Sequence, residues 1–479
     1  MRNLPNKDVQ FEDGDDLFLK GLDSLGCLRL SKSIDGLMGS DKSTRGATPV
    51  LRLYQYPAID KLAPVLLGLM FHHKVPNLHD TTEESQESLE RVVGEFTKDL
   101  PVPRGIDTPS DRAAPRSKLN VAILGSRNFK QTSMWHCLVR RKSLSLGHMP
   151  DSDRLTFMPI DLSKPRLGLS HEGYTELQHN AHVLIHNAWK VDFKWTLDSY
   201  GPQYLRSVRQ LVDLVAGSSL RPQPRLVFIS STSSVQHLGK RQTTDWNGKT
   251  GSVAEGDSTD ISFFLGYGRS KHAAERILAL ASRLSRIPVT IVRCGQIAGA
   301  TAPPQTAWPE TDWVPLLARI SAALGKIPRD LPDMDWTPVD LTARVICELA
   351  GLVAEEVGSQ RGLLEVFNVV NPRTTQWADF VAEFQCLRGE ETKVSEVSMA
   401  EWVQCLVGSD FQGVSEADTA SFVAIHPFFD YLSKMIAKGA GLQLPFNTRG
   451  AVETSKTLAS MPPVDRTMLS MWFQQWGLM

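Results

Sequence analysis

Short apolar runs alternate with stretches of helical periodicity through the middle of the chain. Beyond position 271, alanine, isoleucine and leucine recur at intervals of three and four residues, which predicts an amphipathic helix. Five apolar runs have the length and composition of buried strands: residues 120–125, 154–161, 181–187, 226–229 and 287–293. Because strands and a helix follow one another in this way, the pattern predicts an α/β fold with a doubly wound parallel sheet.

The domains are predicted from where the alternation of strand and helix patterns begins and ends. Residues 1–75 have the apolar positions of a small all-helical unit, whereas residues 76–115 are rich in polar residues and proline and are predicted to be a linker. The α/β unit is expected to fill residues 116–479. Its sheet core is placed in 116–300, and a smaller subdomain in 301–479, where Pro, Trp and Gly break the alternation.

Composition excludes some classes of function. The 52 Lys and Arg residues nearly balance the 53 Asp and Glu residues, so no overall charge favours nucleic acid or an anionic membrane. No apolar run approaches the roughly 20 residues that span a bilayer, and the N-terminus lacks the apolar core of a secretory signal. The six cysteines are scattered, without metal-ligand spacing. A cytoplasmic protein with reduced thiols and no metal site is expected.

One helix is predicted to carry catalytic chemistry. Tyr267 and Lys271 are four residues apart and therefore share a helix face. The ammonium is expected to lower the pKa of the phenol, which could then protonate an oxyanion. Thr232, in the hydroxyl cluster that ends the strand at 226–229, would supply a second hydrogen bond. The competing interpretation is an exposed Tyr/Lys pair. The three residues resemble the site of short-chain dehydrogenases/reductases, which transfer hydride to a carbonyl.

A second motif lies near the N-terminus. The sequence Gly-Leu-Asp-Ser-Leu at 21–25, followed by Leu-Tyr-Gln-Tyr-Pro-Ala at 53–58, resembles acyl and peptidyl carrier proteins. This resemblance implies a 4′-phosphopantetheine arm on Ser24, at a helix start that favours a phosphodiester. The alternative is that Ser24 only caps a helix. Since only 23 residues precede Ser24, the first carrier helix is expected to be missing or short.

From Leu119 onward the chain resembles the thioester reductase domains of fungal adenylate-forming reductases, which are extended short-chain reductases related to carboxylic acid and aminoadipate reductases. The fold that this implies is Rossmann-type, with the smaller subdomain on the substrate side. The resemblance rests on the segments at 161–169, 183–193, 227–232, 335–340 and 366–372, together with Tyr267 and Lys271.

The resemblance implies NADPH-dependent release of a carrier-bound acyl or aminoacyl thioester as an aldehyde, with further reduction to an alcohol left open. Thr232 and Tyr267 would hold the oxyanion, and Tyr267 would donate the proton. Lys271 would also contact the nicotinamide ribose. Further cofactor-binding residues are implied at Gly125, Asp161, Asn187, Ala188, Gly295 and Ile297. Each has an ordinary alternative as a turn or strand-end residue.

The glycine-rich phosphate loop departs from the family pattern. After the strand at 120–125 only Gly125 remains, because Ser-Arg-Asn-Phe-Lys follows it. Gly125 and Asp161 are only 36 positions apart, too close for two helix and strand pairs of ordinary length. At least one βα unit is therefore predicted to be shortened or lost.

Two other functions stay open at this point. The chain could be a catalytically silent remnant that keeps the carrier and its docking surface but binds no dinucleotide, or a domain that releases the thioester without reduction. In the reductase interpretation, an adenylating enzyme or acyl-loading synthase would supply the acyl group in trans, and a phosphopantetheinyl transferase would modify Ser24.

Overall fold

The structure is a computed structural model of the chain. Ser24 and the loop that follows Gly125 lie outside the residues that it describes. The described residues are 12–15, 17, 20, 22, 30, 33–34, 53, 56, 58–72, 81–103, 120–125, 136–140, 155–192, 195–235, 253–256, 266–302, 308–353, 361–388, 394–408, 416–437 and 446–478.

A seven-stranded sheet in the order β10-β6-β5-β4-β1-β2-β3 forms the centre of the molecule. Five neighbouring strands are parallel, and four of them carry predicted apolar runs, while β10 was not predicted. The fifth predicted run, 154–161, forms a strand only at β3, which is antiparallel. The strands are β1 (Asn120–Gly125), β2 (His136–Arg140), β3 (Leu155–Phe157), β4 (Val183–Asn187), β5 (Arg225–Ser231), β6 (Val289–Cys294) and β10 (Leu364–Val369).

The spacing prediction for the start of the sheet is confirmed. Strand β2 runs antiparallel to β1, and β3 runs antiparallel to β2. A parallel pair needs a crossover of a dozen or more residues, whereas an antiparallel pair can be joined by a short turn. The described strands between Gly125 and Asp161 therefore form an antiparallel edge, with no complete βα unit among the described residues of this segment.

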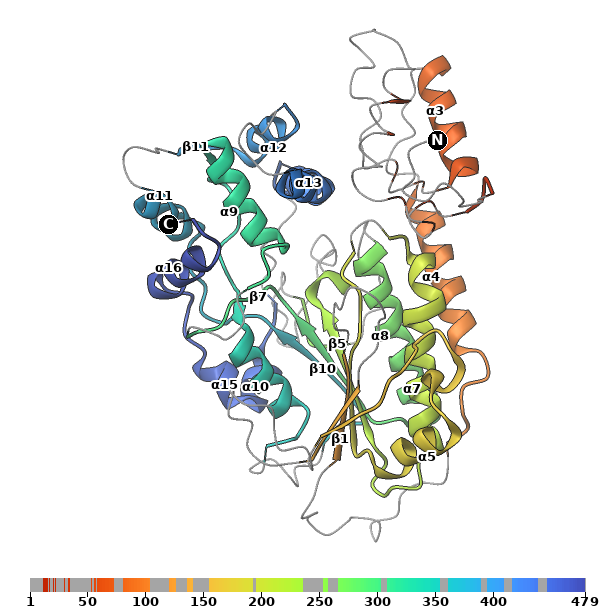
Figure 1. The fold of residues 1–479 in the computed structure, drawn as a ribbon. Helices are drawn as coiled ribbons and strands as arrows, with labels where there is room; N and C mark the ends of the chain where they lie inside the picture. Colours follow the sequence, from red (N-terminus) through yellow and green to blue (C-terminus); the bar gives the residue numbers. More distant parts are fainter. Residues whose placement is uncertain are drawn as a thin grey trace.

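Helices cover both faces of the sheet, as Figure 1 shows, so the predicted doubly wound fold is confirmed. One face packs against α4, α5, α7 and α8 through alternate strand residues such as Leu184 and Phe228. The opposite face, which includes Ile185 and Val227, packs against α10, α14 and α15. The helices are α4 (Thr81–Thr97), α5 (His171–Asn180), α7 (Arg206–Gly217), α8 (Gly266–Ser285), α10 (Val339–Leu349), α14 (Arg449–Thr454) and α15 (Lys456–Ser460).

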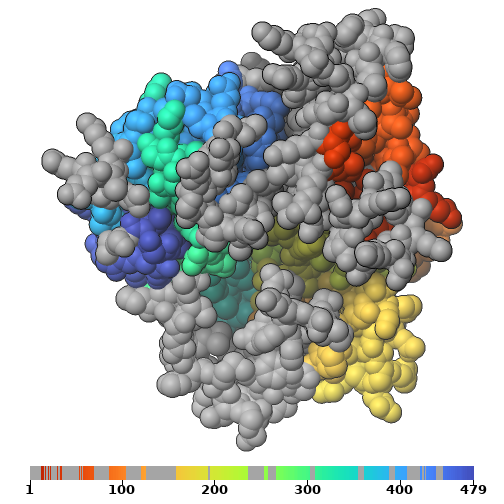
Figure 2. Space-filling model, turned by 45° about the horizontal axis from the view of Figure 1, so that its top comes forward, coloured from red at the N-terminus to blue at the C-terminus, as the bar shows by residue number. Residues whose placement is uncertain are grey.

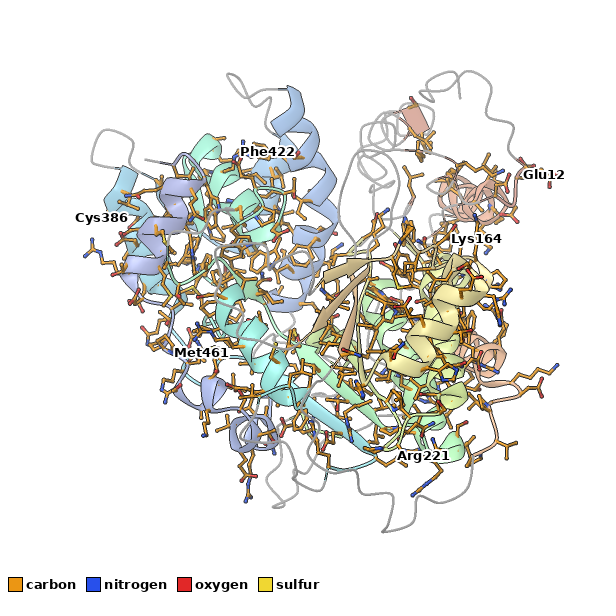
Figure 3. The ribbon with its side chains drawn as sticks, turned by 60° about the horizontal axis from the view of Figure 1, so that its bottom comes forward. Glu12, Lys164, Arg221, Cys386, Phe422 and Met461 are labelled. Atoms are coloured by element: carbon orange, nitrogen blue, oxygen red, sulfur yellow. The ribbon has the colours of Figure 1, made fainter. Side chains whose placement is uncertain are left out.

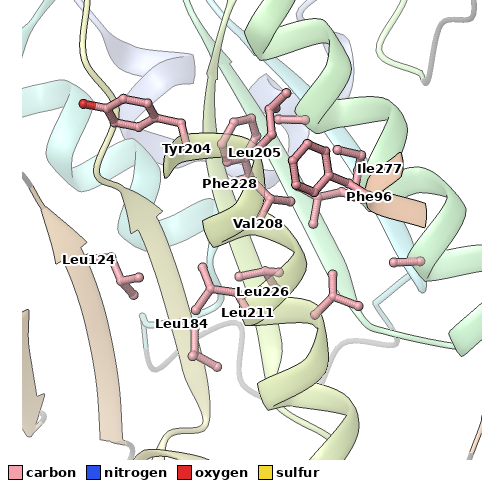
Figure 4. Close-up of a cluster of buried hydrophobic side chains, with 14 of the residues drawn as sticks. Phe96, Leu124, Leu184, Tyr204, Leu205, Val208, Leu211, Leu226, Phe228 and Ile277 are labelled. Atoms are coloured by element: carbon pink, nitrogen blue, oxygen red, sulfur yellow. The ribbon is translucent and has the colours of Figure 1, made fainter. Parts of the chain in front are cut away.

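The predicted linker is wrong for residues 81–97, which form α4. Leu89, Val92, Val93 and Phe96 follow the helical i, i+3, i+4, i+7 spacing and are all buried in the sheet's main core. Figure 4 shows Phe96 in this core near Ile277 of α8. The helix was not predicted because its apolar stripe consists of only four residues, which lie among Glu, Ser and Thr.

Polar contacts fix the same helix from outside the core. The two guanidinium nitrogens of Arg276 on α8 donate to the carboxylate of Glu90 at 3.0 and 3.3 Å. Arg209 on α7 donates to the backbone carbonyls of Phe96, Lys98 and Asp99 at 3.3, 2.5 and 2.8 Å. Helix α4 and the residues that follow it are therefore bound to α7 and α8, two of the other helices that cover this face.

Most of the remaining C-terminal residues pack around a second core, although β10 lies in the sheet and α10 covers one face of it. This second core is aromatic: Trp308 makes edge-to-face contacts with Trp336 and Trp472. Figure 3 places Phe422 in this C-terminal subdomain and Met461 beside the sheet. The principal helices are α9 (Trp313–Leu324), α11 (Trp377–Arg388), α12 (Met399–Gly408), α13 (Glu416–Ala437) and α16 (Arg466–Gln475).

The N-terminal unit is described only in part. Leu53 and Leu62, the latter on α3 (Ile59–His72), form a small cluster with partly buried apolar neighbours. In Figure 2 the described residues of this unit, in red and orange, lie at the right of the view, and the C-terminal subdomain, in blue, lies at the left. None of the described helices combines the length and apolar character needed to cross a membrane.

Candidate active site

Three neighbouring elements bring the predicted catalytic residues to one edge of the sheet. Strand β5 ends at Ser231 and continues into a short 3-10 helix, Thr232–Ser234, while β6 ends at Cys294. These strands are parallel, so their carboxyl ends meet at the same edge. Helix α8 starts there, with Tyr267 in its first turn and Lys271 in its second.

Gly266 allows α8 to begin close to the preceding chain. A Cβ atom on Gly266 would lie 1.9 Å from the carbonyl oxygen of Trp195 and 2.8 Å from the Cα of Thr196. Any side chain would therefore push the start of α8, and Tyr267 with it, away from the sheet. No signal in the sequence marks this requirement, because the close approach involves residues some seventy positions earlier.

Tyr267 is partly buried against the main core, and its hydroxyl is hydrogen-bonded to the side chain of Ser231. Burial raises the pKa of Tyr267 to about 12, and the Ser231 hydrogen bond opposes this only in part. The expectation that Lys271 lowers the pKa of this phenol is therefore wrong for this structure. The phenol keeps its proton through neutral pH, as a proton donor must.

Ser231 is not among the residues predicted from the sequence. It makes the hydrogen bond to Tyr267, whereas the sequence predicts Thr232 as the hydroxyl that acts beside this tyrosine. The Ser231 Oγ accepts from the Ser233 backbone N–H at 3.2 Å and from the Ser233 Oγ at 2.9 Å. Its own proton is then available for the Tyr267 oxygen. Thr232 is the next residue and begins the 3-10 helix. Five consecutive hydroxyl residues obscured which side chain would face Tyr267, because that depends on where β5 ends.

Lys271 is 3% exposed and lies inside a polar and aromatic cage. Its Nζ donates to the carbonyl oxygen of Ile229 at 2.6 Å and lies 4.5 and 4.7 Å from the ring centroids of Trp189 and Phe228. The centroid of the Tyr267 ring is 6.0 Å away. Burial lowers the pKa of Lys271 to about 7, although Cys294 and Glu275 favour the charged form.

This lowered pKa predicts how stability depends on pH. The folded chain releases the Lys271 proton near pH 7, whereas the unfolded chain holds it to about 10.5. Between these values the unfolded state binds more protons, so stability rises with pH, by at most about 1.4 kcal/mol per pH unit. The Lys271→Met variant lacks this contribution. We therefore expect the free energy of unfolding of the variant, relative to that of the wild type, to decrease from pH 7 to pH 9.5 in urea unfolding experiments. A difference that stays constant over this range would contradict the lowered pKa of Lys271.

Three of the predicted cofactor residues, Gly125, Asn187 and Gly295, also lie at this edge. Asn187 is exposed at the end of β4 and in register with Gly125 at the end of β1. Among the described residues, no atom would lie within 4 Å of a Cβ atom on Gly125. Gly295 is in the opposite situation, since a Cβ there would lie 2.8 Å from Val370. These residues fit a dinucleotide crossing the carboxyl ends of the strands.

The positions of the other three predicted cofactor residues, Ala188, Ile297 and Asp161, are also explained by packing or by a turn. Ala188 is buried directly after Asn187, and Ile297 is partly buried in β7 (Ile297–Ala298). The Asp161 Oδ1 accepts from the Ser163 N–H at 3.0 Å and from its Oγ at 2.6 Å, and this hydrogen bonding lowers the pKa of Asp161. Asp161 thus serves the turn, while its contact with adenine stays a prediction.

Comparison with known proteins agrees with this geometry. The chain is 26% identical to a carboxylic acid reductase of Neurospora crassa and 24% identical to the adenylate-forming reductase Nps11 of Serpula lacrymans. Each match covers 98% of this chain and 45% of the relative. The chain therefore spans about half the length of these curated relatives.

Two solved structures share the fold. A thiolation-reductase di-domain from an archaeal non-ribosomal peptide synthetase superimposes with a TM-score of 0.58 at 16% identity, covering 98% of this chain and 93% of that one. The terminal R domain of the myxalamid PKS-NRPS pathway gives a TM-score of 0.52 at 21% identity, covering 67% of this chain and 75% of that one.

A family model locates the relationship along the chain. The model described as male sterility protein, an NAD-binding family, matches residues 111–346, which contain the sheet edge with Tyr267, Lys271 and the β5 hydroxyls. The resemblance to carboxylic acid reductases and adenylate-forming reductases is also confirmed. The chain is therefore similar to the family described as male sterility protein over residues 111–346, just under half of its length.

Proposed function

We propose that the chain reduces a carrier-bound acyl or aminoacyl thioester to an aldehyde with NADPH. The observation that carries this proposal is the pairing of a protonated phenol, Tyr267, with the Ser231 hydroxyl, beside Lys271 at the carboxyl edge of the sheet. The names of the relatives, carboxylic acid reductase and adenylate-forming reductase, support the same reaction class.

The chain's own residues have separable roles in this reaction. NADPH, when bound, supplies the hydride to the thioester carbonyl carbon. Ser231 and Thr232 are the hydroxyls available to hold the carbonyl oxygen, and Tyr267 gives that oxygen its proton. The carbon–sulfur bond then breaks, which leaves an aldehyde and a free thiol. Asn187, Gly125 and Lys271 are the residues that would border the cofactor.

The carrier part of the proposal concerns Ser24. We infer that Ser24 bears the 4′-phosphopantetheine arm, installed by a phosphopantetheinyl transferase, and that an adenylating or acyl-loading partner supplies the acyl group. The thiolation-reductase di-domain, whose fold extends over nearly the whole of this chain, supports this arrangement. The reaction would take place in the cytoplasm.

The first test is NADPH binding to the purified full-length chain by calorimetry, with NADH alongside. We expect saturable NADPH binding in the micromolar range, followed by oxidation of NADPH when an acyl-pantetheine thioester is added. The same sample must show a cooperative unfolding transition. A folded protein that binds no NADPH at millimolar concentration would contradict the reductase and favour a carrier or docking module.

A further inference from the structure

A third polar residue shares the catalytic face of α8. Glu275 follows Lys271 by four residues, and Lys271 follows Tyr267 by four, so the three side chains point from the same side of the helix. Glu275 is 4% exposed and lies one turn deeper in the protein than Lys271. The proposed reaction gives it no chemical role.

The Glu275 carboxylate is the centre of a buried network. Its Oε1 accepts from the Ser230 Oγ at 2.5 Å and from the Ser234 Oγ at 2.6 Å. Both serines are buried. The Arg293 side chain on β6 donates to both carboxylate oxygens, with its Nη2 at 2.7 Å from Oε2. Glu275 therefore joins α8, β5 and β6.

The two serines stand on either side of the proposed oxyanion hydroxyls. Ser230 precedes Ser231 and Thr232 at the end of β5, and Ser234 closes the 3-10 helix after them. One carboxylate oxygen thus holds both ends of this turn to the helix that carries Tyr267. The distance between the hydroxyls and the phenol is set by this connection, because hydrogen bonds to a charged group are short and strong.

Arg293 keeps the network charged and extends it. Burial alone would raise the pKa of Glu275, but Arg293 and the two serine hydroxyls hold it below its ordinary value. Arg293, 1% exposed, also donates to the carbonyls of Ala254 and Gly256 at 3.3 and 2.9 Å. A buried ion pair with this many partners fixes geometry more reliably than it adds stability.

We propose that Glu275 is a positioning residue that holds the Ser231–Thr232 turn at the correct distance from Tyr267. The inference deepens the proposed reductase function and rests on it. Glu275 does not touch the reacting atoms in this role. It acts through Ser230 and Ser234, so removing either hydroxyl should loosen the turn while the ion pair with Arg293 stays in place.

The same sheet offers a matched control at its opposite end. Thr290, at the start of β6, donates its hydroxyl to the Glu365 Oε2 at 3.1 Å, and Arg225 forms an ion pair with the same oxygen at 3.2 Å. This cluster also joins three strands, β5, β6 and β10, through a carboxylate, an arginine and a hydroxyl. It lies at the amino ends of the strands, away from Tyr267.

The test compares Ser234→Ala, the double variant Ser230→Ala/Ser234→Ala and the control Thr290→Val in the full-length chain. For the double variant we expect kcat to fall by about tenfold or more, because small misplacements are costly in catalysis. KM and the Kd for NADPH should stay within about twofold, and Thr290→Val should keep kcat within about twofold. Equal losses of kcat in the double and control variants would overturn the proposal.

Hydrogen exchange gives a second readout that needs no activity. Peptides that cover residues 226–235 should exchange faster in the double variant than in Thr290→Val, measured by mass spectrometry under identical conditions. An inactive wild type would end the reductase proposal, whereas unchanged exchange in this segment would end the positioning proposal by itself. Replacing Glu275 directly is a poorer test, because it leaves the buried Arg293 charge unpaired and threatens folding.

Discussion

Replacing Tyr267 with phenylalanine is expected to lower kcat for thioester reduction by about a thousandfold, within the range attributed to general acid catalysis. The ring that packs against the main core is retained, so the fold and the NADPH Kd should change little. What is lost is the hydroxyl that pairs with Ser231 and carries the proton. Steady-state kinetics with an acyl-pantetheine thioester and NADPH measures the effect.

Tyr204→Phe is the matched control for this experiment. Tyr204 is a buried tyrosine of the same core and packs against Trp189, which itself faces the Lys271 ammonium. Loss of the Tyr204 hydroxyl should leave kcat within about twofold of the wild-type value, because a side chain that only packs in the core does not supply a proton to the substrate. A similar loss in both variants would show that the Tyr267 effect arises from packing, and would contradict its role as proton donor.

The same assay distinguishes the two hydroxyls beside Tyr267. The structure brings the Ser231 side chain onto the phenol, whereas the resemblance to thioester reductases implies Thr232. Ser231→Ala should reduce kcat more than Thr232→Val if the hydrogen bond seen in the structure persists with substrate bound. The reverse order would favour the prediction made from the sequence, with Thr232 turning toward the oxyanion during the reaction.

The sheet was predictable because its strands are buried on both faces. Such strands, β5 and β6 among them, appear in the sequence as nearly continuous aliphatic runs. The shortened start of the sheet was predictable from spacing, since the segment between Gly125 and Asp161 is too short for complete βα units. That β2 and β3 are antiparallel was not predicted. The motif with Tyr267 and Lys271 pointed to the candidate site, because a four-residue interval places both side chains on a common helix face wherever the helix packs.

The features that escaped prediction depend on contacts between distant segments. The pKa of Tyr267 is governed by burial, which the sequence does not state, and not by its nearest charge. The close approach of the Trp195 backbone to Gly266 likewise cannot be predicted from the sequence, because it depends on how the two segments pack. The role of Ser231 depends on the residue at which β5 ends, and strand ends are the least predictable boundaries. Each miss is a property of packing.

The segment that precedes the sheet should contribute to the stability of the reductase unit as a whole. Phe96→Ala removes an aromatic side chain that is 7% exposed and packs in the main core, for which we expect a loss of about 3–5 kcal/mol in the free energy of unfolding. Chemical denaturation followed by tryptophan fluorescence measures the shift. A mere linker would show almost none.

The control for this prediction is Val102→Ala, a few residues beyond α4. Val102 is 85% exposed, so its truncation should change the free energy of unfolding by less than about 0.5 kcal/mol. If Phe96→Ala behaved like Val102→Ala, α4 would be detachable from the sheet and would not belong to its folding unit. If instead Phe96→Ala destabilises the whole unit, α4 folds together with the sheet and with α8, the helix that carries Tyr267 and Lys271.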